Sequence, residues 1–226
     1  RLSGYLRLML SNEKVIIVIH KFIMEDVHMS EQIEIEFKNL LTFEEFNHLM
    51  QHFKIKPEHF SVQKNHYFDT VTFDLKKYTS ALRIREKNSS YEMTLKQPLE
   101  NKKGLLETNW NIDPDTANKI IKDGGIPDSK ISERIKNLKI NPQEIRYFGT
   151  LTTKRVELPF KSGLLVLDNS SYFQIEDYEV EFEVDNFDQG KKEFDLLLSE
   201  AGIPVRPTEN KVQRFYNQMI LNHTEE

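Results

Sequence analysis

Residues 33–38, Ile-Glu-Ile-Glu-Phe-Lys, decide the fold, because hydrophobic and charged residues alternate at every position. Successive side chains of a β-strand point to opposite faces of the sheet. The three hydrophobic residues would therefore share one face, and Glu34, Glu36 and Lys38 would share the other. This stretch predicts a strand that separates a hydrophobic layer from a strongly charged one.

The same alternation returns in later parts of the chain. At 82–85, 91–96 and 178–184, polar residues, mostly Arg, Glu and Lys, oppose hydrophobic ones. Further strands are predicted at 66–73, 104–112, 148–158 and 163–168. About eight strands, joined mostly by short turns, favour an antiparallel sheet.

Helices are predicted between and after these strands. Thr42 and Glu45 match a capping box for a helix over 42–53, in which hydroxyl and carboxylate each bond a free backbone N–H. Further helices are expected from Pro114 to about Gly124, from Asp128 or Ser129 to about Leu138, over about 188–201 up to Gly202, and over about 208–222 with Thr208 as its cap. No linker or repeat interrupts the pattern, so we expect one α+β domain over 29–226.

The composition excludes several classes of protein. The chain of 226 residues has no cysteine, which excludes disulfides, thiolate zinc sites and cysteine nucleophiles. Any metal would have to be bound by carboxylates or histidine. The net charge of −5 argues against a general nucleic-acid binder, which needs an excess of Lys and Arg. A cytoplasmic protein is expected.

Residues 1–28 differ in pattern from the rest of the chain. Their hydrophobic run, residues 15–19, is far shorter than the ~20 residues that span a bilayer, so no membrane anchor is expected. The chain opens with Arg1, and Met29 directly precedes the first well-patterned segment. We expect residues 1–28 to be a non-native or upstream-translated extension. Separately, we expect the protein to be a monomer or homodimer.

The charged strand faces have two explanations. Each strand could lie on an open sheet with one side in water, where Lys and Glu are common. Alternatively, the strands could close into a barrel whose hydrophobic face lies outward under helices. The charged lumen of such a barrel would bind a highly charged ligand.

Electrostatics show what a charged lumen would require. Two carboxylates two residues apart on a strand, ~6.7 Å, repel by ~2.5 kcal/mol at an effective dielectric of 20 but by only ~0.6 kcal/mol in water. Glu179, Glu181 and Glu183 in one lumen would therefore need a cation such as Mg²⁺ or Mn²⁺. The basic residues at 83–85 and Lys96 would need a multiply charged anion, and arginine matches phosphate oxygens with paired hydrogen bonds.

Residues 34–38, Glu-Ile-Glu-Phe-Lys, resemble the E-x-E-x-K signature of the CYTH family, also called triphosphate tunnel metalloenzymes. That family includes thiamine triphosphatases, inorganic triphosphatases and one class of adenylate cyclases. The order of later segments strengthens the match. In chain order these are Tyr67-Phe68-Asp69-Thr70, Leu82-Arg83-Ile84-Arg85, Glu92-Met93-Thr94-Leu95-Lys96, Thr153-Lys154-Arg155, Val166-Leu167-Asp168, Glu179-Val180-Glu181, and Lys211 with Arg214. The resemblance covers residues 31–216.

The resemblance implies a closed, eight-stranded antiparallel β-barrel with helices packed outside and a C-terminal helix at one mouth. Its implied metal ligands are Glu34, Glu36, Asp168, Glu179 and Glu181. Its implied phosphate-binding residues are Lys38, Arg83, Arg85, Lys96, Arg155 and Lys211, and its implied catalytic residues are Glu179, Glu181 and Lys38. Residues of lesser weight are Glu183, Glu92, Glu107, Lys154 and Arg214.

Strand parity separates Lys154 from Arg155, because neighbouring residues of a regular strand face opposite sides. Arg155 shares its face with Thr153 and Glu157, whereas Lys154 shares its face with hydrophobic residues. We therefore expect Arg155 to enter the lumen.

The implied function is hydrolysis of the terminal phosphate of inorganic tripolyphosphate or a related organic triphosphate, dependent on Mg²⁺ or Mn²⁺. A water would attack the terminal phosphorus in line. Either a second metal or a carboxylate of the 179–183 strand would activate that water. Two alternatives stay open: an adenylate cyclase that converts ATP to cyclic AMP, and a non-catalytic protein that binds nucleotide or polyphosphate.

Overall fold

The computed structural model describes residues 29–99 and 103–224. The expectation for residues 1–28 lies outside the described residues. Within the described ranges the chain forms nine strands: β1 (Met29–Glu34), β2 (Glu36–Leu41), β3 (Ser61–Asp69), β4 (Ala81–Lys87), β5 (Ser90–Pro98), β6 (Leu105–Ile112), β7 (Arg146–Phe160), β8 (Gly163–Tyr172) and β9 (Ile175–Val184). It also forms six α-helices: α3 (Phe43–His52), α4 (Asp74–Lys77), α5 (Pro114–Asp123), α6 (Lys130–Asn137), α7 (Phe187–Glu200) and α8 (Lys211–Thr224). Two 3₁₀ turns, Pro57–His59 and Pro142–Glu144, complete the described elements.

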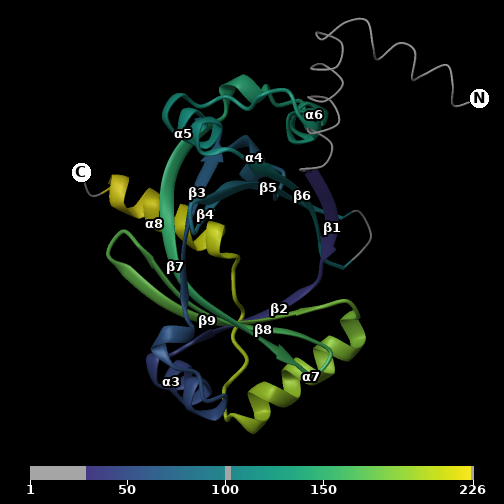
Figure 1. Ribbon diagram of the computed structural model, residues 1–226, viewed down its shortest axis with the longest axis vertical. Coiled ribbons are helices and arrows are strands. Elements are labelled where there is room, and N and C mark those ends of the chain that lie inside the picture. Colours follow the sequence, from purple (N-terminus) through teal and green to yellow (C-terminus); the bar gives the residue numbers. More distant parts are fainter. Residues whose placement is uncertain (1–28, 100–102, 225–226) are drawn as a thin grey trace, which may run out of the picture.

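All strand pairs are antiparallel, and the sheet curls strongly around an interior space (Figure 1). The strand order is β1-β6-β5-β4-β3-β7-β8-β9-β2. The predicted antiparallel α+β fold is therefore confirmed.

The predicted closed barrel of eight strands is not confirmed, because the stretch predicted as one strand is divided at Ile35. Its first half, β1, pairs with β6, and its second half, β2, pairs with β9. A continuous strand in a closed barrel would pair with both neighbours along its length. The sheet is instead open, and its two end strands are joined through Ile35.

Helices cover the outer, hydrophobic face of the sheet, as the alternation predicts. One core cluster packs α5 and α6 on the β3–β6 side, with Ile84, Met93 and Ile131 fully buried. A second cluster packs α3 and α7 under β8 and β9, with Leu49, Phe182 and Leu198 buried. These helix pairs lie at opposite ends of the molecule in Figure 1. The inner face is left to polar residues.

Local caps explain several boundaries. Thr42 and Glu45 form the predicted capping box of α3. Ser129 caps α6, and Gly202, with φ of +66°, follows the end of α7. Strand β3 ends at Asp69 rather than at residue 73, because the Asp69 carboxylate accepts hydrogen bonds from the backbone N–H groups of residues 70, 75 and 76.

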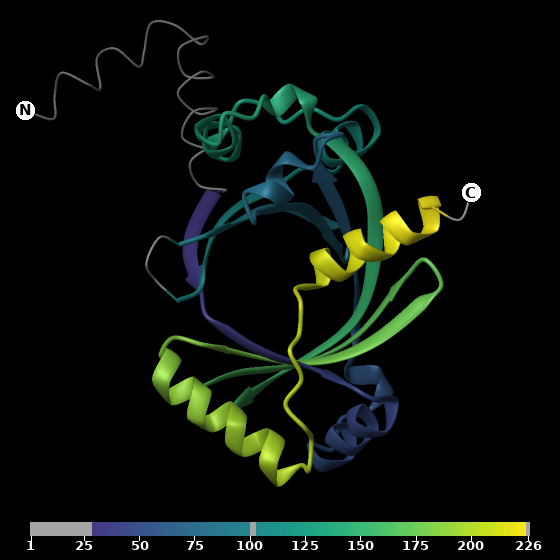
Figure 2. The ribbon, with the colours of Figure 1, turned by 180° about the vertical axis from the view of Figure 1, so that it is seen from behind.

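Helix α8 begins at Lys211, and Thr208 is not its cap. The Thr208 hydroxyl instead accepts a hydrogen bond from the backbone N–H of Leu40 at 3.0 Å and donates to the carbonyl of Arg206 at 3.0 Å. Arg206 also binds the carbonyl of Leu40 and the side chain of Asn39. The segment before α8 is thereby fixed along the edge of β2 (Figure 2).

Helix α8 crosses in front of β7, as Figure 2 shows. Phe215 and Tyr216 are buried, and Phe215 packs with Tyr67, Leu151 and Tyr172 in a third core cluster. The predicted C-terminal helix thus faces the interior of the sheet. Among the described residues, no helix has the length and hydrophobicity needed to cross a membrane.

Candidate functional site

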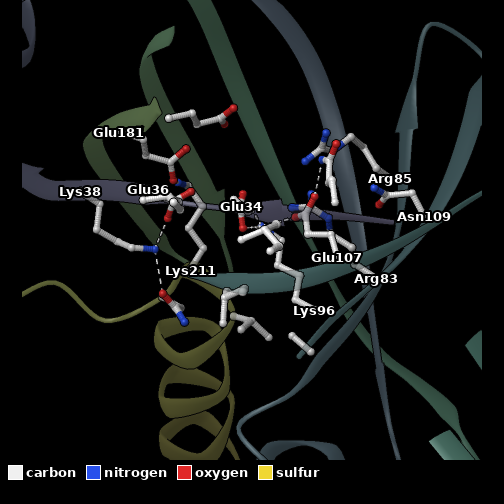
Figure 3. A pocket seen from close by; sticks show the side chains of 18 of the residues that line it. Glu34, Glu36, Lys38, Arg83, Arg85, Lys96, Glu107, Asn109, Glu181 and Lys211 are labelled. Atoms are coloured by element: carbon white, nitrogen blue, oxygen red, sulfur yellow. Dashed lines mark hydrogen bonds and ion pairs between the residues drawn. The ribbon is translucent and has the colours of Figure 1, made fainter. Parts of the chain in front are cut away.

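A cavity of about 980 Å³ lies inside the curled sheet and carries charged residues from seven strands and α8 (Figure 3). Nine of the residues predicted for the site line it: Glu34, Glu36, Lys38, Arg83, Arg85, Lys96, Arg155, Glu181 and Lys211. Three residues of lesser predicted weight also line it: Glu92, Glu107 and Glu183. A second cavity of about 360 Å³ near the β4–β5 turn shares Arg85 and Glu92 with the first.

Three carboxylates meet on one wall of the cavity. Glu34, Glu36 and Glu183 each offer an oxygen, and these atoms lie within 4.8 Å of one another. Pairing of β2 with β9 places Glu36 opposite Glu183, and the break at Ile35 leaves Glu34 on the same wall. Gly104 allows the chain just before β6 to approach the backbone of Glu34 closely, because a Cβ there would lie 2.5 Å from the Glu34 carbonyl oxygen.

These three carboxylates bring negative charges close together in a place where water solvates them poorly. Burial, together with the negative charges of Glu181, Glu34 and Glu36, raises the pKa of Glu183 to about 7, although Arg155 opposes the shift. Burial also raises the pKa of Glu34, with Lys96 opposing and Glu36 reinforcing the shift. Clustered carboxylate oxygens are the ligands that hard divalent cations prefer.

Arg83 and Arg85 form a basic pair on β4 in the same cavity. In the described part of the chain, the buried Nε atom of each arginine has no hydrogen-bond partner. The charge of Arg83, together with burial, lowers the pKa of Arg85 to about 10. Two close guanidinium groups that repel each other form a natural binding site for a polyanion.

Lys96 on β5 bridges two carboxylates. Its Nζ atom lies 2.6 Å from Glu34 Oε2 and 2.7 Å from Glu107 Oε1. Although burial acts to raise it, the pKa of Glu107 is lowered to about 2, because Lys96 and Arg83 stabilise the charged carboxylate. Lys96 thus connects the acidic wall with the part of the cavity near Arg83.

Beneath the cavity lies a buried ionic network. Arg155 donates from Nε to Asp168 Oδ1 at 2.8 Å, and from Nη2 to Glu181 Oε2 at 2.7 Å. Lys211 contacts Asp168 and Glu179, each at 2.9 Å, and also binds Glu181. Although burial acts to lower it, the pKa of Lys211 is raised well above its usual range by these carboxylates.

Two residues predicted as metal ligands belong to this network rather than to the cavity wall. Asp168 and Glu179 are fully buried and do not line the cavity. Arg214 binds Glu179 at 2.6 Å and Asp177 at 3.0 Å. Glu181 does line the cavity, but Lys211 and Arg155 each bind one of its oxygens. The converging carboxylates on the wall include Glu183 instead.

The remaining predicted residues take defined places. Lys38 pairs with Glu36 and donates to Asn210 Oδ1 at 2.7 Å (Figure 3). Arg155 faces the interior, and Lys154 is exposed on the outer side, as strand parity predicts.

The sequence reasoning missed some residues that line the cavity. Gln32 donates to Glu107 Oε2 at 2.9 Å, and its two-residue spacing from Glu34 could have placed it on the inner face. Asn109 could have been found in the same way from Glu107. Asn210 and Tyr216 come from the α8 region, where no alternation points to the lumen.

The sequence model described as the CYTH domain matches residues 32–216. The Bacillus subtilis (strain 168) protein named "Putative triphosphatase YjbK" is 42% identical over 190 residues, which cover 84% of this chain and 97% of that protein.

Solved structures show the same fold. A Bacillus halodurans protein, described as "a putative adenylate cyclase", has a TM-score of 0.79 and 41% identity, covering 82% of this chain and 98% of that one. The Hippeastrum protein HpAC1, described as a "Putative adenylyl cyclase" with "a dominant triphophatase activity", has a TM-score of 0.69 and 24% identity, covering 82% of this chain and 96% of that one. The match over residues 32–216 and the identity to the first relative agree with the cavity's arrangement: this chain belongs to the CYTH domain family.

Proposed function

We propose that this protein hydrolyses the terminal phosphoanhydride bond of inorganic tripolyphosphate or a related organic triphosphate, with Mg²⁺ or Mn²⁺ as cofactor. The observation that carries the proposal is that one cavity holds both a cluster of carboxylates and a pair of arginines. Three converging carboxylates lie on one wall, and two arginines without hydrogen-bond partners at Nε lie in the same cavity. A magnesium or manganese triphosphate would neutralise both groups.

The residues present fit a divalent cation. One carboxylate oxygen from each of Glu34, Glu36 and Glu183 lies within 4.8 Å of the other two, and carboxylate oxygens are suitable ligands for a hard ion. Burial and the neighbouring carboxylates raise the pKa of Glu183, so a bound cation would add a favourable charge there. Glu34, Glu36 and Glu183 would bind the ion. When bound, a divalent cation neutralises phosphate charge and favours attack on phosphorus.

The other cavity residues take roles in phosphoryl transfer. Arg83 and Arg85 would bind the phosphate chain, because both line the cavity and an anion would relieve the repulsion by Arg83 that lowers the pKa of Arg85. Lys38 and Lys96, which lie beside Glu36 and Glu34, would stabilise further negative charge on the phosphate chain. Of the two predicted catalytic carboxylates, only Glu181 lines the cavity, and we assign the orientation of the attacking water to it.

Hydrolysis then needs no covalent enzyme intermediate. The water oxygen bonds to the terminal phosphorus, the bridging P–O bond breaks, and orthophosphate and a diphosphate leave. Phosphoryl transfer depends chiefly on positioning and electrostatic stabilisation, which this set of side chains supplies.

The related proteins support hydrolysis and also provide a rival. The relative at 42% identity is named "Putative triphosphatase YjbK", whereas the structure at 41% identity is described as "a putative adenylate cyclase". A cyclase would release diphosphate and cyclic AMP from ATP by the same cationic contacts. A protein that only binds nucleotide or polyphosphate is the third candidate.

That the protein acts in the cytoplasm, as a monomer or homodimer, stays a prediction from its sequence.

A product assay separates these functions. The purified protein would be incubated with tripolyphosphate, thiamine triphosphate or ATP, each with Mg²⁺, Mn²⁺ or a chelator. Orthophosphate released only with metal supports the proposal. Cyclic AMP with diphosphate would establish the cyclase, and binding without turnover would leave a non-catalytic protein.

Two variants connect the activity to this cavity. Glu36→Gln should abolish metal-dependent turnover and leave the fold unchanged by circular dichroism. Arg83→Ala should mainly raise KM, by roughly 10- to 100-fold, because it removes charged hydrogen bonds of about 1.5–3 kcal/mol. Glu44→Gln on the exposed side of α3 is the matched control and should behave as wild type. Full activity of Glu36→Gln would refute the metal assignment.

A further inference from the structure

Among residues 29–99 and 103–224, four buried side-chain atoms without hydrogen-bond partners belong to the arginine pair and to residues opposite it on the neighbouring strands. They are Arg83 Nε, Arg85 Nε, Thr94 Oγ1 and Asn65 Oδ1. Thr94 is 1% exposed and Asn65 is 2% exposed, so water cannot readily satisfy their oxygens. A buried polar group left unpaired costs about 1–3 kcal/mol, so such a group calls for an explanation.

Strand register pairs each orphan donor with one orphan acceptor. Arg83 on β4 lies directly opposite Thr94 on β5, and Arg85 lies directly opposite Asn65 on β3. Directly opposed residues project from the same face with Cβ atoms about 4.5–5.5 Å apart. Each Nε–H therefore has an unused oxygen on the neighbouring strand. Neither Thr94 nor Asn65 lines the cavity itself, so both lie deeper in the wall than the guanidinium groups.

We propose that Thr94 and Asn65 are positioning residues for the arginine pair: when a triphosphate binds, the Nε–H of Arg83 donates to Thr94 Oγ1 and the Nε–H of Arg85 donates to Asn65 Oδ1. The outer amino groups of both guanidinium groups then point to the phosphate oxygens. This inference rests on the proposed function and extends it to two neutral residues outside the cavity lining.

The charges explain why the pairing belongs to the ligand-bound protein. Without an anion, Arg83 and Arg85 repel each other, as the lowered pKa of Arg85 shows. A bound polyanion attracts both guanidinium groups and uses their outer N–H groups. Only Nε–H is then left without an acceptor, and the oxygens of Thr94 and Asn65 supply one on each side.

Removal of an unused hydroxyl gives an unusual combination of effects. Thr94→Val keeps the shape and deletes an orphan polar atom, so the free protein should be as stable as wild type or more stable. The same variant should raise KM for tripolyphosphate ~3- to 10-fold, the loss of one hydrogen bond, with a smaller change in kcat. Thr94→Ser keeps the acceptor and should restore KM to within about twofold of wild type.

Thr153→Val is the matched control. Thr153 is also fully buried and belongs to the inner face of β7, but its hydroxyl already lies 3.2 Å from Ser170 Oγ within a buried pair. The same substitution there should lower Tm and leave KM unchanged. A merely structural Thr94 would behave as Thr153 does.

A second variant tests the other pair. Asn65→Asp places a carboxylate opposite Arg85, so an internal counter-charge competes with phosphate. We expect a larger rise in KM than for Thr94→Val, together with a raised Tm of the free protein.

The outcomes separate this inference from the proposed function. Tm is measured by thermal unfolding of the metal-free protein, and KM by orthophosphate release from tripolyphosphate with Mg²⁺. An active wild type whose Thr94→Val variant keeps its KM would overturn the positioning role alone, as would a Thr94→Ser variant as impaired as Thr94→Val. An inert wild type would overturn the proposed function, and this inference with it.

Discussion

The phenol of Tyr216 on α8 donates a hydrogen bond of 2.7 Å to Asp69 Oδ2, at the end of β3. Both residues are only 2% exposed. The same carboxylate accepts the backbone N–H group of Thr70, which follows β3, and those of Leu75 and Lys76 in α4. One acidic side chain therefore joins the closing helix to the sheet and ends the strand.

Tyr216→Phe should destabilise the protein by about 1.5–3 kcal/mol, because it removes a buried hydrogen bond to a charged acceptor. Urea unfolding followed by circular dichroism measures the change. Tyr78→Phe is the control, since Tyr78 is 47% exposed, and it should stay within about 0.5 kcal/mol of wild type. Equal stabilities for the two variants would contradict the importance of the Tyr216 contact.

Glu183 and Glu179 should respond differently to replacement by glutamine. Glu183→Gln should weaken Mg²⁺ binding at least roughly tenfold without loss of stability, because it removes one of three crowded carboxylates. Glu179→Gln should instead cost about 3–5 kcal/mol of stability, because Lys211 and Arg214 lose a fully buried partner. Isothermal titration with Mg²⁺ and urea unfolding give the two readouts. The reverse pattern would return the metal site to Glu179.

Replacement of the two neighbouring basic residues of β7 should change stability by clearly different amounts. Arg155→Met breaks buried contacts with Asp168 and Glu181 and should cost about 3–5 kcal/mol. Lys154→Met alters an exposed side chain and should change stability by less than about 0.5 kcal/mol. Similar unfolding midpoints for the two variants would show that the ionic network contributes little to stability.

His66 should make stability depend on pH below neutrality. Burial lowers the pKa of His66, although Glu86, 3.5 Å from Nε2, opposes the shift. At this residue the unfolded chain therefore binds a proton at a higher pH than the folded protein does, so the contribution of His66 to stability should fall as pH drops from about 6.5 through its folded pKa. Above that window both states are neutral and the effect disappears.

Thermal unfolding between pH 7.5 and 5 measures this dependence. His66→Asn should remove the destabilisation that His66 causes at the acidic end of the profile, while the same change at the exposed His48 should leave the profile as in wild type. A profile unchanged by His66→Asn would assign the pH dependence to other groups.

The alternation of hydrophobic and polar residues predicted much of the site, because it can be read within a single strand. It placed Arg155 inside and Lys154 outside, and it put Glu34, Arg83 and Glu181 on inner faces. The capping box at Thr42 was equally readable, since both partners lie within four residues.

Features that depend on distant partners could not be read from the pattern. Asp168 and Glu179 leave the cavity wall because Lys211 and Arg214 reach them from α8. Thr208 does not cap α8 because the backbone N–H of Leu40 binds its hydroxyl. The break at Ile35 likewise reflects the pairing of its two sides with different strands.

The pairing of β1 with β6 and of β2 with β9 also sets a schedule for synthesis. Glu36 meets Glu183 only after β9 has been made, and Lys211 emerges later still. Glu36 therefore lacks its β9 neighbour until late in synthesis, and contacts between remote segments form slowly. Truncated products that end before β9 would lack Glu183 and Lys211, so the charged cavity is complete only when the final part of the chain has been made.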